Sequence, residues 1–266
     1  MSTASGPARD LSIFDGIARV DVDPAQLRPT LKDIALHAAG EGFALAGEMR
    51  DTVRELLPRV TGRVRPHFAY AAKRVARIRD GRLVLTNGIE LPFCLPAVTL
   101  EPSGLVAALC TMGPEADGLR TDLGLERVLD AWLLDAVLLT ELELVETLCQ
   151  QDISRRAALA GLCVGPALVP GVADVPAAAQ QALFECLGDA AAGVTLNKVR
   201  AMIPLKSFSC WFPLWTGPAE AADGMHLCDR CDLDCCTFRR RGLVDDRRRA
   251  SPSPDHMDMD TRGRDC

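Results

Sequence analysis

A cluster of four cysteines near the C-terminus is the part of the sequence whose residue types most directly imply chemistry. Cys228, Cys231, Cys235 and Cys236 fall within nine residues, and His226 precedes them. A Cys-x-x-Cys pair can direct two thiolates toward one point, and thiolates are soft ligands that suit zinc and iron–sulfur clusters. The spacing therefore predicts a metal centre in this segment.

The identity of that centre depends on how the ligands are distributed along the chain. Structural zinc sites usually draw on two separated pairs of ligands. Here the thiolates come from one compact segment, which is closer to iron–sulfur ligation. We therefore expect an iron–sulfur cluster, with zinc as the alternative. Adjacent cysteines seldom reach one centre, so the fourth ligand stays open among Cys236, His226, Cys210, Cys266 and a non-protein group. A redox-active dithiol or a chance accumulation of cysteines is the competing interpretation.

The composition sets limits on the rest of the protein. The chain has 266 residues, of which 48% are hydrophobic, and its net charge is −6. It is long enough to bury a substantial core. The negative charge argues against a nucleic-acid partner, although two arginine triplets, residues 239–241 and 247–249, follow the cysteines. The first ten residues lack a signal peptide, and no apolar stretch is long enough to span a bilayer. We therefore expect a cytoplasmic protein without a membrane partner.

The cysteine count also bears on the cellular compartment. Eleven cysteines without an export signal argue against a framework of disulfides. Six of them are scattered through apolar sequence, where a free cysteine behaves as a small buried hydrophobe. These six are Cys94, Cys110, Cys149, Cys163, Cys186 and Cys210.

Hydrophobic periodicity and turn signals predict an α+β fold, with a mixed or antiparallel twisted sheet and flanking helices. Helices are expected from about residue 30, at 41–57 (ended by Pro58), after Pro114, at 125–150 and at 177–187. Strands are expected at residues 17–22, 75–78, 83–85, 105–111, 194–196, 201–203 and 207–214, with hairpin turns at Asp80-Gly81 and Asn87-Gly88. Five acids of the long 125–150 helix are interpreted as a solvated face: Asp130, Asp135, Glu141, Glu143 and Glu146.

A loop rich in glycine and proline, residues 165–171, is a candidate ligand-binding segment. Proline and glycine at this density fix the course of the backbone and let a ligand approach closely. A purely structural loop is equally compatible with the pattern. Further on, Lys206 and Ser207 open the strand at 207–214 and are weaker candidates, since Lys206 could simply be a surface lysine at a strand end.

The order of these motifs resembles the activation domain of cobalamin-dependent methionine synthase and the stand-alone bacterial proteins related to it. The resemblance covers residues 97–239. It rests on the Pro170-Gly171 loop, the following helix, residues 193–196 (GVTL), residues 202–209 (MIPLKSFS), residues 109–115 before a long helix, and the tail cysteines Cys228, Cys231 and Cys236 with Arg239. The fold implied is a curved α+β unit.

The resemblance also implies a function. Domains of this family bind S-adenosylmethionine and present its methyl group to an inactive cobalamin held by a partner, which is remethylated with an electron from a reductant. The expected partner is a corrinoid protein or a cobalamin-dependent methyltransferase. The expected cofactor-binding residues are Pro170, Gly171, Lys206 and Ser207. If the protein is catalytic, its reaction would be this methyl transfer with cobalamin reduction.

Two further functions stay open at this point. The protein could be an iron–sulfur electron-transfer partner of a corrinoid methyltransferase that binds no S-adenosylmethionine, or a zinc-stabilised binding module without catalysis. The expected organisation has four parts. Residues 1–96 form an N-terminal α+β segment that packs on the main unit, 97–217 the activation-domain-like core, 218–241 the cysteine-rich metal or iron–sulfur segment, and 242–266 a disordered tail.

Overall fold

The computed structural model of the chain describes residues 11–216, with gaps at residues 15–18, 41, 80–81, 95–101, 125, 173–174 and 192. For residues 12 and 92–94 it describes the backbone alone. The cysteine cluster at residues 228–236 and the two segments predicted at 218–241 and 242–266 therefore lie outside the described residues.

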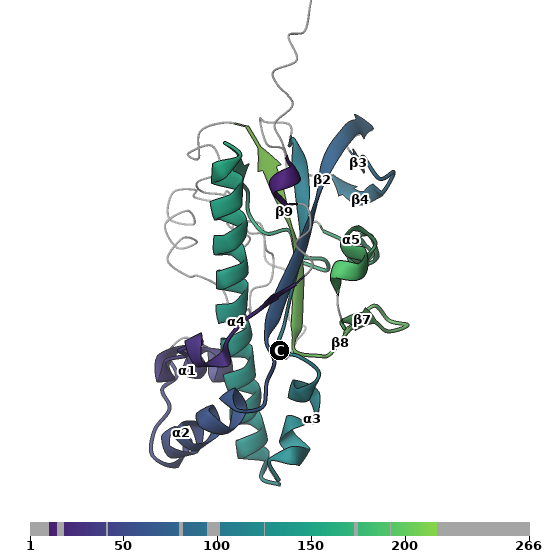
Figure 1. The fold of residues 1–266 in the computed structure, drawn as a ribbon. Helices are drawn as coiled ribbons and strands as arrows, with labels where there is room; N and C mark the ends of the chain where they lie inside the picture. The colour runs from purple at the N-terminus through teal and green to yellow at the C-terminus, as the bar shows by residue number, and fades with distance from the viewer. Residues whose placement is uncertain are drawn as a thin grey trace, which may run out of the picture.

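A curled antiparallel sheet forms the centre of the molecule (Figure 1). Its strands in spatial order are β4 (Glu90–Cys94), β3 (Arg82–Leu85), β2 (His67–Arg79), β5 (Gly104–Thr111), β9 (Ser207–Trp215) and β6 (Cys163–Val164). The short β1 (Val20–Asp21) also pairs with β2. Every pairing between these strands is antiparallel. The α+β prediction is confirmed, and among the described strands the sheet is antiparallel rather than mixed.

Helices cover both faces of this sheet (Figure 1). One face carries α1 (Leu31–Ala39), α2 (Glu48–Thr61) and the long α4 (Val128–Leu159). The other carries α5 (Ala179–Leu187) and a two-stranded hairpin of β7 (Thr195–Leu196) and β8 (Met202–Ile203). Helix α3 (Glu115–Asp122) follows β5 and lies beside the first turns of α4. Short 3-10 helices at Leu11–Phe14, Pro24–Gln26 and Gly188–Ala191 complete the described elements.

Strand β5 shows why the sheet has two cores. All eight of its residues are buried, because both faces of the strand are covered. Val106, Ala108 and Cys110 point to the core shared with α1, α2 and α4, whereas Leu105, Ala107 and Leu109 point to the core shared with α5. The continuous apolar run at residues 105–111 is therefore a strand, as predicted, and the structure adds that both of its faces are covered.

Helix α4 differs from its prediction in length and in exposure. It begins at Val128 and ends at Leu159, past the expected end at residue 150, because no glycine or proline interrupts it before Gly161. The interpretation of its acids as a solvated face is wrong for Glu141, which is 1% exposed, and Glu146 is only partly exposed. Because α4 packs against the sheet and against α1 and α2, little of its surface is exposed to solvent.

Helix α2 also departs from its prediction, which ended a helix before Pro58. The helix spans Glu48–Thr61 and contains Pro58. Val53, Leu56 and Val60 are buried along one face, so the turn beyond the proline still packs. The burial of Val60 helps to offset the backbone hydrogen bond that the proline cannot donate.

Strand β2, from the segment before residue 97, pairs with β5, from the segment after it, through eight residues from His67 to Arg74. The position of a boundary between domains stays a prediction. Among the described residues, no helix combines the length and the apolar character that a bilayer crossing requires.

Candidate functional site

The predicted residues Lys206 and Ser207 lie where the end of β5 meets the start of β9. The backbone N–H of Met112 donates to the Lys206 carbonyl at 2.9 Å. The Ser207 hydroxyl lies 2.8 Å from Thr111 Oγ1, which also accepts from the Gly113 N–H at 3.2 Å. Ser207 is therefore tied into the junction of the two strands, and its hydroxyl is occupied there.

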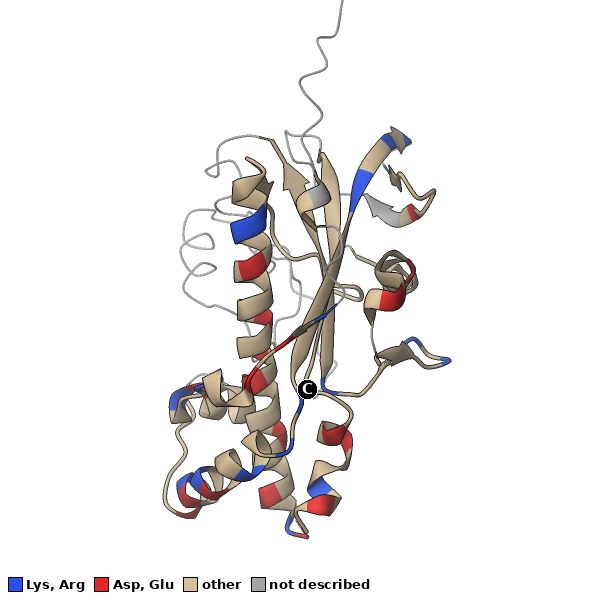
Figure 2. Ribbon diagram, in the orientation of Figure 1, with Lys and Arg blue, Asp and Glu red and all other residues tan. Residues whose placement is uncertain are grey.

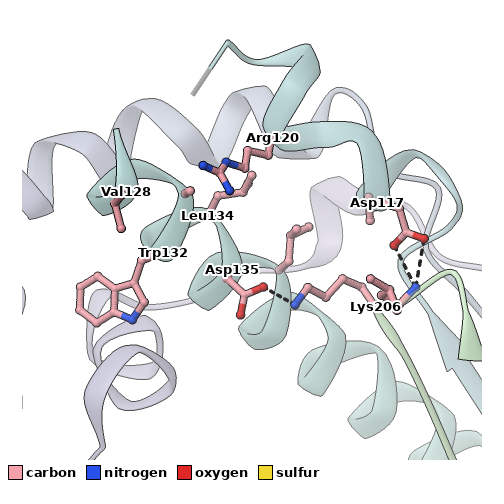
Figure 3. A pocket seen from close by; sticks show the side chains of 11 residues that line it. Asp117, Arg120, Val128, Trp132, Leu134, Asp135 and Lys206 are labelled. Atoms are coloured by element: carbon pink, nitrogen blue, oxygen red, sulfur yellow. Dashed lines mark hydrogen bonds and ion pairs between the residues drawn. The ribbon is translucent and has the colours of Figure 1, made fainter. Parts of the chain in front are cut away.

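The loop before Ser207 is held by both neighbouring helices. The Lys206 ammonium pairs with Asp135 of α4, and the Leu205 N–H donates to the Asp117 carboxylate of α3, 2.9 Å from Oδ1 (Figure 3). The charge of Lys206 is thus offset by direct contact. These four residues fix the loop against α3 and α4.

A groove of about 500 Å³ opens between α3, the first turns of α4 and this loop. We call it the α3–α4 groove. Its apolar lining includes Trp132, Leu134 and Leu138, and Arg120 of α3 lies over it (Figure 3). A groove of this volume is within the range of about 300–1,000 Å³ found for small-molecule sites.

Lysine, arginine, aspartate and glutamate residues are frequent along α1, α2 and α3, at the end of the molecule where this groove lies (Figure 2). The predicted Pro170-Gly171 turn occupies a different place, at the outer edge of β9. Just before it, Leu168 exchanges backbone hydrogen bonds of 2.8 and 2.9 Å with Trp211 of β9. Gly171 adopts a left-handed conformation with φ of +85°, and its N–H donates to the Val175 carbonyl at 2.8 Å. In the described structure, no hydrogen bond or ion pair joins this turn to Lys206 or Ser207. Because the Leu168–Trp211 bridge is antiparallel, the chain runs from Leu168 toward the Ser207 end of β9, and whether the four predicted residues form one site stays a prediction.

The first glycine of this loop has a packing role. A Cβ atom on Gly165 would lie 2.5 Å from the ring of the buried Trp215. The Gly165 N–H also donates to the Pro213 carbonyl of β9 at 2.8 Å. For Gly165, the structural interpretation of the loop is the better one.

Substitution of Gly165 by alanine should destabilise the protein, because the added methyl group displaces the Trp215 ring. We expect the free energy of unfolding to fall by about 2 kcal/mol. Urea denaturation, followed by circular dichroism, measures it. Gly118→Ala is the control, since a Cβ there meets only Asp122 Oδ2 at an ordinary 3.6 Å. Equal midpoints for the two variants would show that the ring does not constrain Gly165.

Two buried acids on α4 are functional candidates that the sequence analysis missed. Burial raises the pKa of Glu141 to about 8, and its Oε2 has no hydrogen-bond partner among the described residues. Burial, together with the nearby charge of Glu143, also raises the pKa of Glu146 to about 8. Carboxyl groups of this kind are protonated at neutral pH and can donate a hydrogen bond or a proton. The sequence did contain a signal for the burial of Glu141. It lies four residues from Val137 and four from Val145, so it shares a helix face with two buried residues.

Three cysteine side chains approach one another between α4 and the sheet. Cys110 of β5, Cys149 of α4 and Cys210 of β9 are buried, and burial raises the pKa of Cys110 and Cys210. Buried thiols with raised pKa values are poor nucleophiles. Of the six scattered cysteines, these three and Cys186 are buried as predicted, Cys163 is partly exposed, and the side chain of Cys94 is not described.

The predicted metal residues Cys228, Cys231, Cys235 and Cys236 lie outside the described part of the chain. Within the described residues, no group of three or more histidine, cysteine, aspartate or glutamate side chains is arranged to hold a metal ion. The iron–sulfur cluster and its zinc alternative therefore stay predictions.

Comparison with known proteins bears on the fold. No protein-family model and no curated protein sequence matches the chain. Among solved structures, the chain is similar to the MetH reactivation domain bound to AdoHcy, with a TM-score of 0.54 and 15% sequence identity. The similarity covers 74% of this chain and 78% of that one. At this identity the likeness establishes a fold of the reactivation-domain type, and it confirms the fold that the motif order predicted.

Proposed function

We propose that this protein binds an S-adenosyl ligand, S-adenosylmethionine or S-adenosylhomocysteine, and serves as an accessory protein to a corrinoid-dependent methyltransferase. The observation that carries the proposal is the fold, which is shared over most of both chains with a reactivation domain bound to AdoHcy. The motif order of residues 97–239 supports it independently, because the resemblance that it carries depends on residue types and their order alone. The partner would hold the cobalamin.

The Pro170-Gly171 turn is the part of the fold that best suits close approach by such a ligand. Its course is fixed by the pairing of Leu168 with Trp211 and by the Gly171–Val175 hydrogen bond. Beside Gly171 the space is open, since an added Cβ would meet only the Ala177 methyl group at 3.8 Å. A fixed turn without a side chain allows a flat nucleoside to lie against the backbone.

The resemblance to the methionine synthase activation domain implies an arginine shortly before Pro-Gly, and this chain has the apolar residues Ala167 and Leu168 there. Leu168 is 3% exposed, so it supplies packing and no charge. The carboxylate of the ligand would therefore not be paired at this position, and we expect weaker binding than an arginine fork would give. Micromolar to millimolar dissociation constants are the range to examine.

Isothermal titration of the full chain with S-adenosylhomocysteine and S-adenosylmethionine tests the proposal. We expect saturable binding, and Gly171→Val should weaken it about tenfold because the side chain enters the open space and strains the turn. Gly88→Val is the matched control. Gly88 has a φ of +87°, it also faces open space, and it lies in the turn between β3 and β4. Absence of binding at millimolar ligand would retire the proposal.

A second candidate is favoured by the cysteines. In this alternative the protein is an electron-transfer partner that reduces the corrinoid through an iron–sulfur cluster and binds no adenosyl ligand. Protein purified without oxygen should then contain iron and acid-labile sulfide, with an absorbance that dithionite bleaches. Cys231→Ser should abolish that absorbance, whereas Cys163→Ser should not. Zinc in place of iron would favour the stabilised binding module instead.

A further inference from the structure

Among the described residues, one cation of the α3–α4 groove has no direct contact that offsets its charge. Lys206 pairs with Asp135, and Asp117 accepts from the Leu205 N–H. Arg120 is exposed, and no hydrogen bond or ion pair reaches its guanidinium from the described residues. Among the described groove residues, Arg120 is therefore the cation that no ion pair neutralises, and Asp117 keeps its negative charge while it accepts from the Leu205 N–H.

The rim of the same groove is apolar and exposed. Val128 is 80% exposed and Leu205 is 68% exposed, and the partly exposed Trp132 lies about one helical turn after Val128 (Figure 3). Leu205 is also held in a fixed position, because its N–H is bonded to Asp117 and the next residue is paired with Asp135. Exposed apolar side chains gathered at a groove and fixed by polar contacts mark a binding surface.

We propose that the α3–α4 groove binds a small organic anion with an apolar or aromatic body. The anionic group would pair with the Arg120 guanidinium, whose planar fork of N–H donors suits a carboxylate, sulfonate or phosphate. The body of the ligand would lie against Trp132, Val128 and Leu205. The volume of about 500 Å³ and the single available cation favour a small molecule over a protein segment. The proposal does not depend on the adenosyl ligand, and its test is made without one.

The probe is 8-anilinonaphthalene-1-sulfonate, an aromatic sulfonate, titrated into the full chain by fluorescence. Its neutral relative N-phenyl-1-naphthylamine, which lacks the sulfonate, is titrated in parallel. Arg120→Gln removes the cation, and Leu205→Ser removes the apolar anchor while keeping the backbone N–H that binds Asp117. The matched controls are Arg77→Gln, an exposed arginine of β2, and Leu159→Ser, a leucine 73% exposed at the end of α4.

Arg120→Gln should weaken binding of the sulfonate about tenfold and change binding of the neutral probe less than about twofold. Leu205→Ser should weaken both probes. The two control variants should change neither. If the sulfonate fails to bind saturably, or if Arg120→Gln and Arg77→Gln affect it equally, the groove is not a site for organic anions. A protein segment would then be the better candidate for this surface.

Discussion

Glu141→Gln should stabilise the protein at alkaline pH and leave its stability nearly unchanged in mild acid. Burial raises the pKa of this carboxyl to about 8 in the folded protein, well above its ordinary value. Below the ordinary value both states are protonated, so the group has no effect. Between the two values only the unfolded chain loses its proton, and stability falls as pH rises. The glutamine variant has no proton to lose.

The expected difference between the variant and the natural protein is near zero at about pH 4 and reaches about 3 kcal/mol at about pH 8. This is below the full effect of the pKa shift, because water and side chains adjust around a buried charge. Urea denaturation at a series of pH values measures it. Glu185→Gln, on an exposed position of α5, is the control and should give the same curve as the natural protein. A parallel pH dependence for Glu141→Gln and the natural protein would show that Glu141 ionises freely.

Glu141 also illustrates which properties a sequence can predict and which it cannot. The strand at residues 105–111, the Asn87-Gly88 turn and the β7–β8 pair were predictable, because each is encoded by a short local pattern. The burial of Glu141 depends on what packs around α4, and those elements are far away in the sequence. The same holds for Pro58, whose helix continues because Val60 finds a buried position.

The candidate site, like the fold, was predictable only where a local pattern encodes it. Motif order identified Lys206 and Ser207, but not the residues that hold the loop around them. Asp135 is 71 residues from Lys206, and Asp117 is 88 residues from Leu205, so no local pattern connects them. Arg120 lacked any signal, because an exposed helical arginine is ordinary until the fold places it over a groove.

The only tyrosine of the chain belongs to a second buried polar group that bears on stability. The Tyr70 side chain is fully buried, and its hydroxyl donates to Asp152 of α4. Arg156 donates to the same carboxylate oxygen at 3.0 Å and also to the Ile13 carbonyl at 3.3 Å. Asp152 therefore joins β2 to α4, and Arg156 extends the contact to the N-terminal 3-10 helix. Burial of Asp152 acts to raise its pKa, but the hydrogen bonds from Tyr70, Arg155 and Arg156 outweigh it, and the pKa is lowered.

Asp152→Ala should lower the free energy of unfolding by about 3 kcal/mol, because the buried Tyr70 hydroxyl loses its acceptor and Arg156 loses its partner. Tyr70→Phe alone should cost only about 1 kcal/mol, since no buried donor is left unpaired. The double variant should cost less than the sum of the two. Asp51→Ala is the control, because Asp51 forms a similar pair with Arg54 on the exposed surface of α2 and should cost no more than about 0.5 kcal/mol.

The pH dependence of stability distinguishes the charge of the Asp152 carboxylate from simple packing of its side chain. Since the folded pKa of Asp152 lies below its ordinary value, its stabilising effect is present above that ordinary value and is lost as pH falls through the folded one. The difference in the free energy of unfolding between the natural protein and Asp152→Ala should therefore narrow in acid. Rising pH increases the contribution of Asp152 to stability, whereas it decreases that of Glu141. The result that contradicts this account is a stability difference that does not change with pH, or a double variant whose loss of stability equals the sum of the two single losses. Tyr70 and Asp152 would then contribute independently.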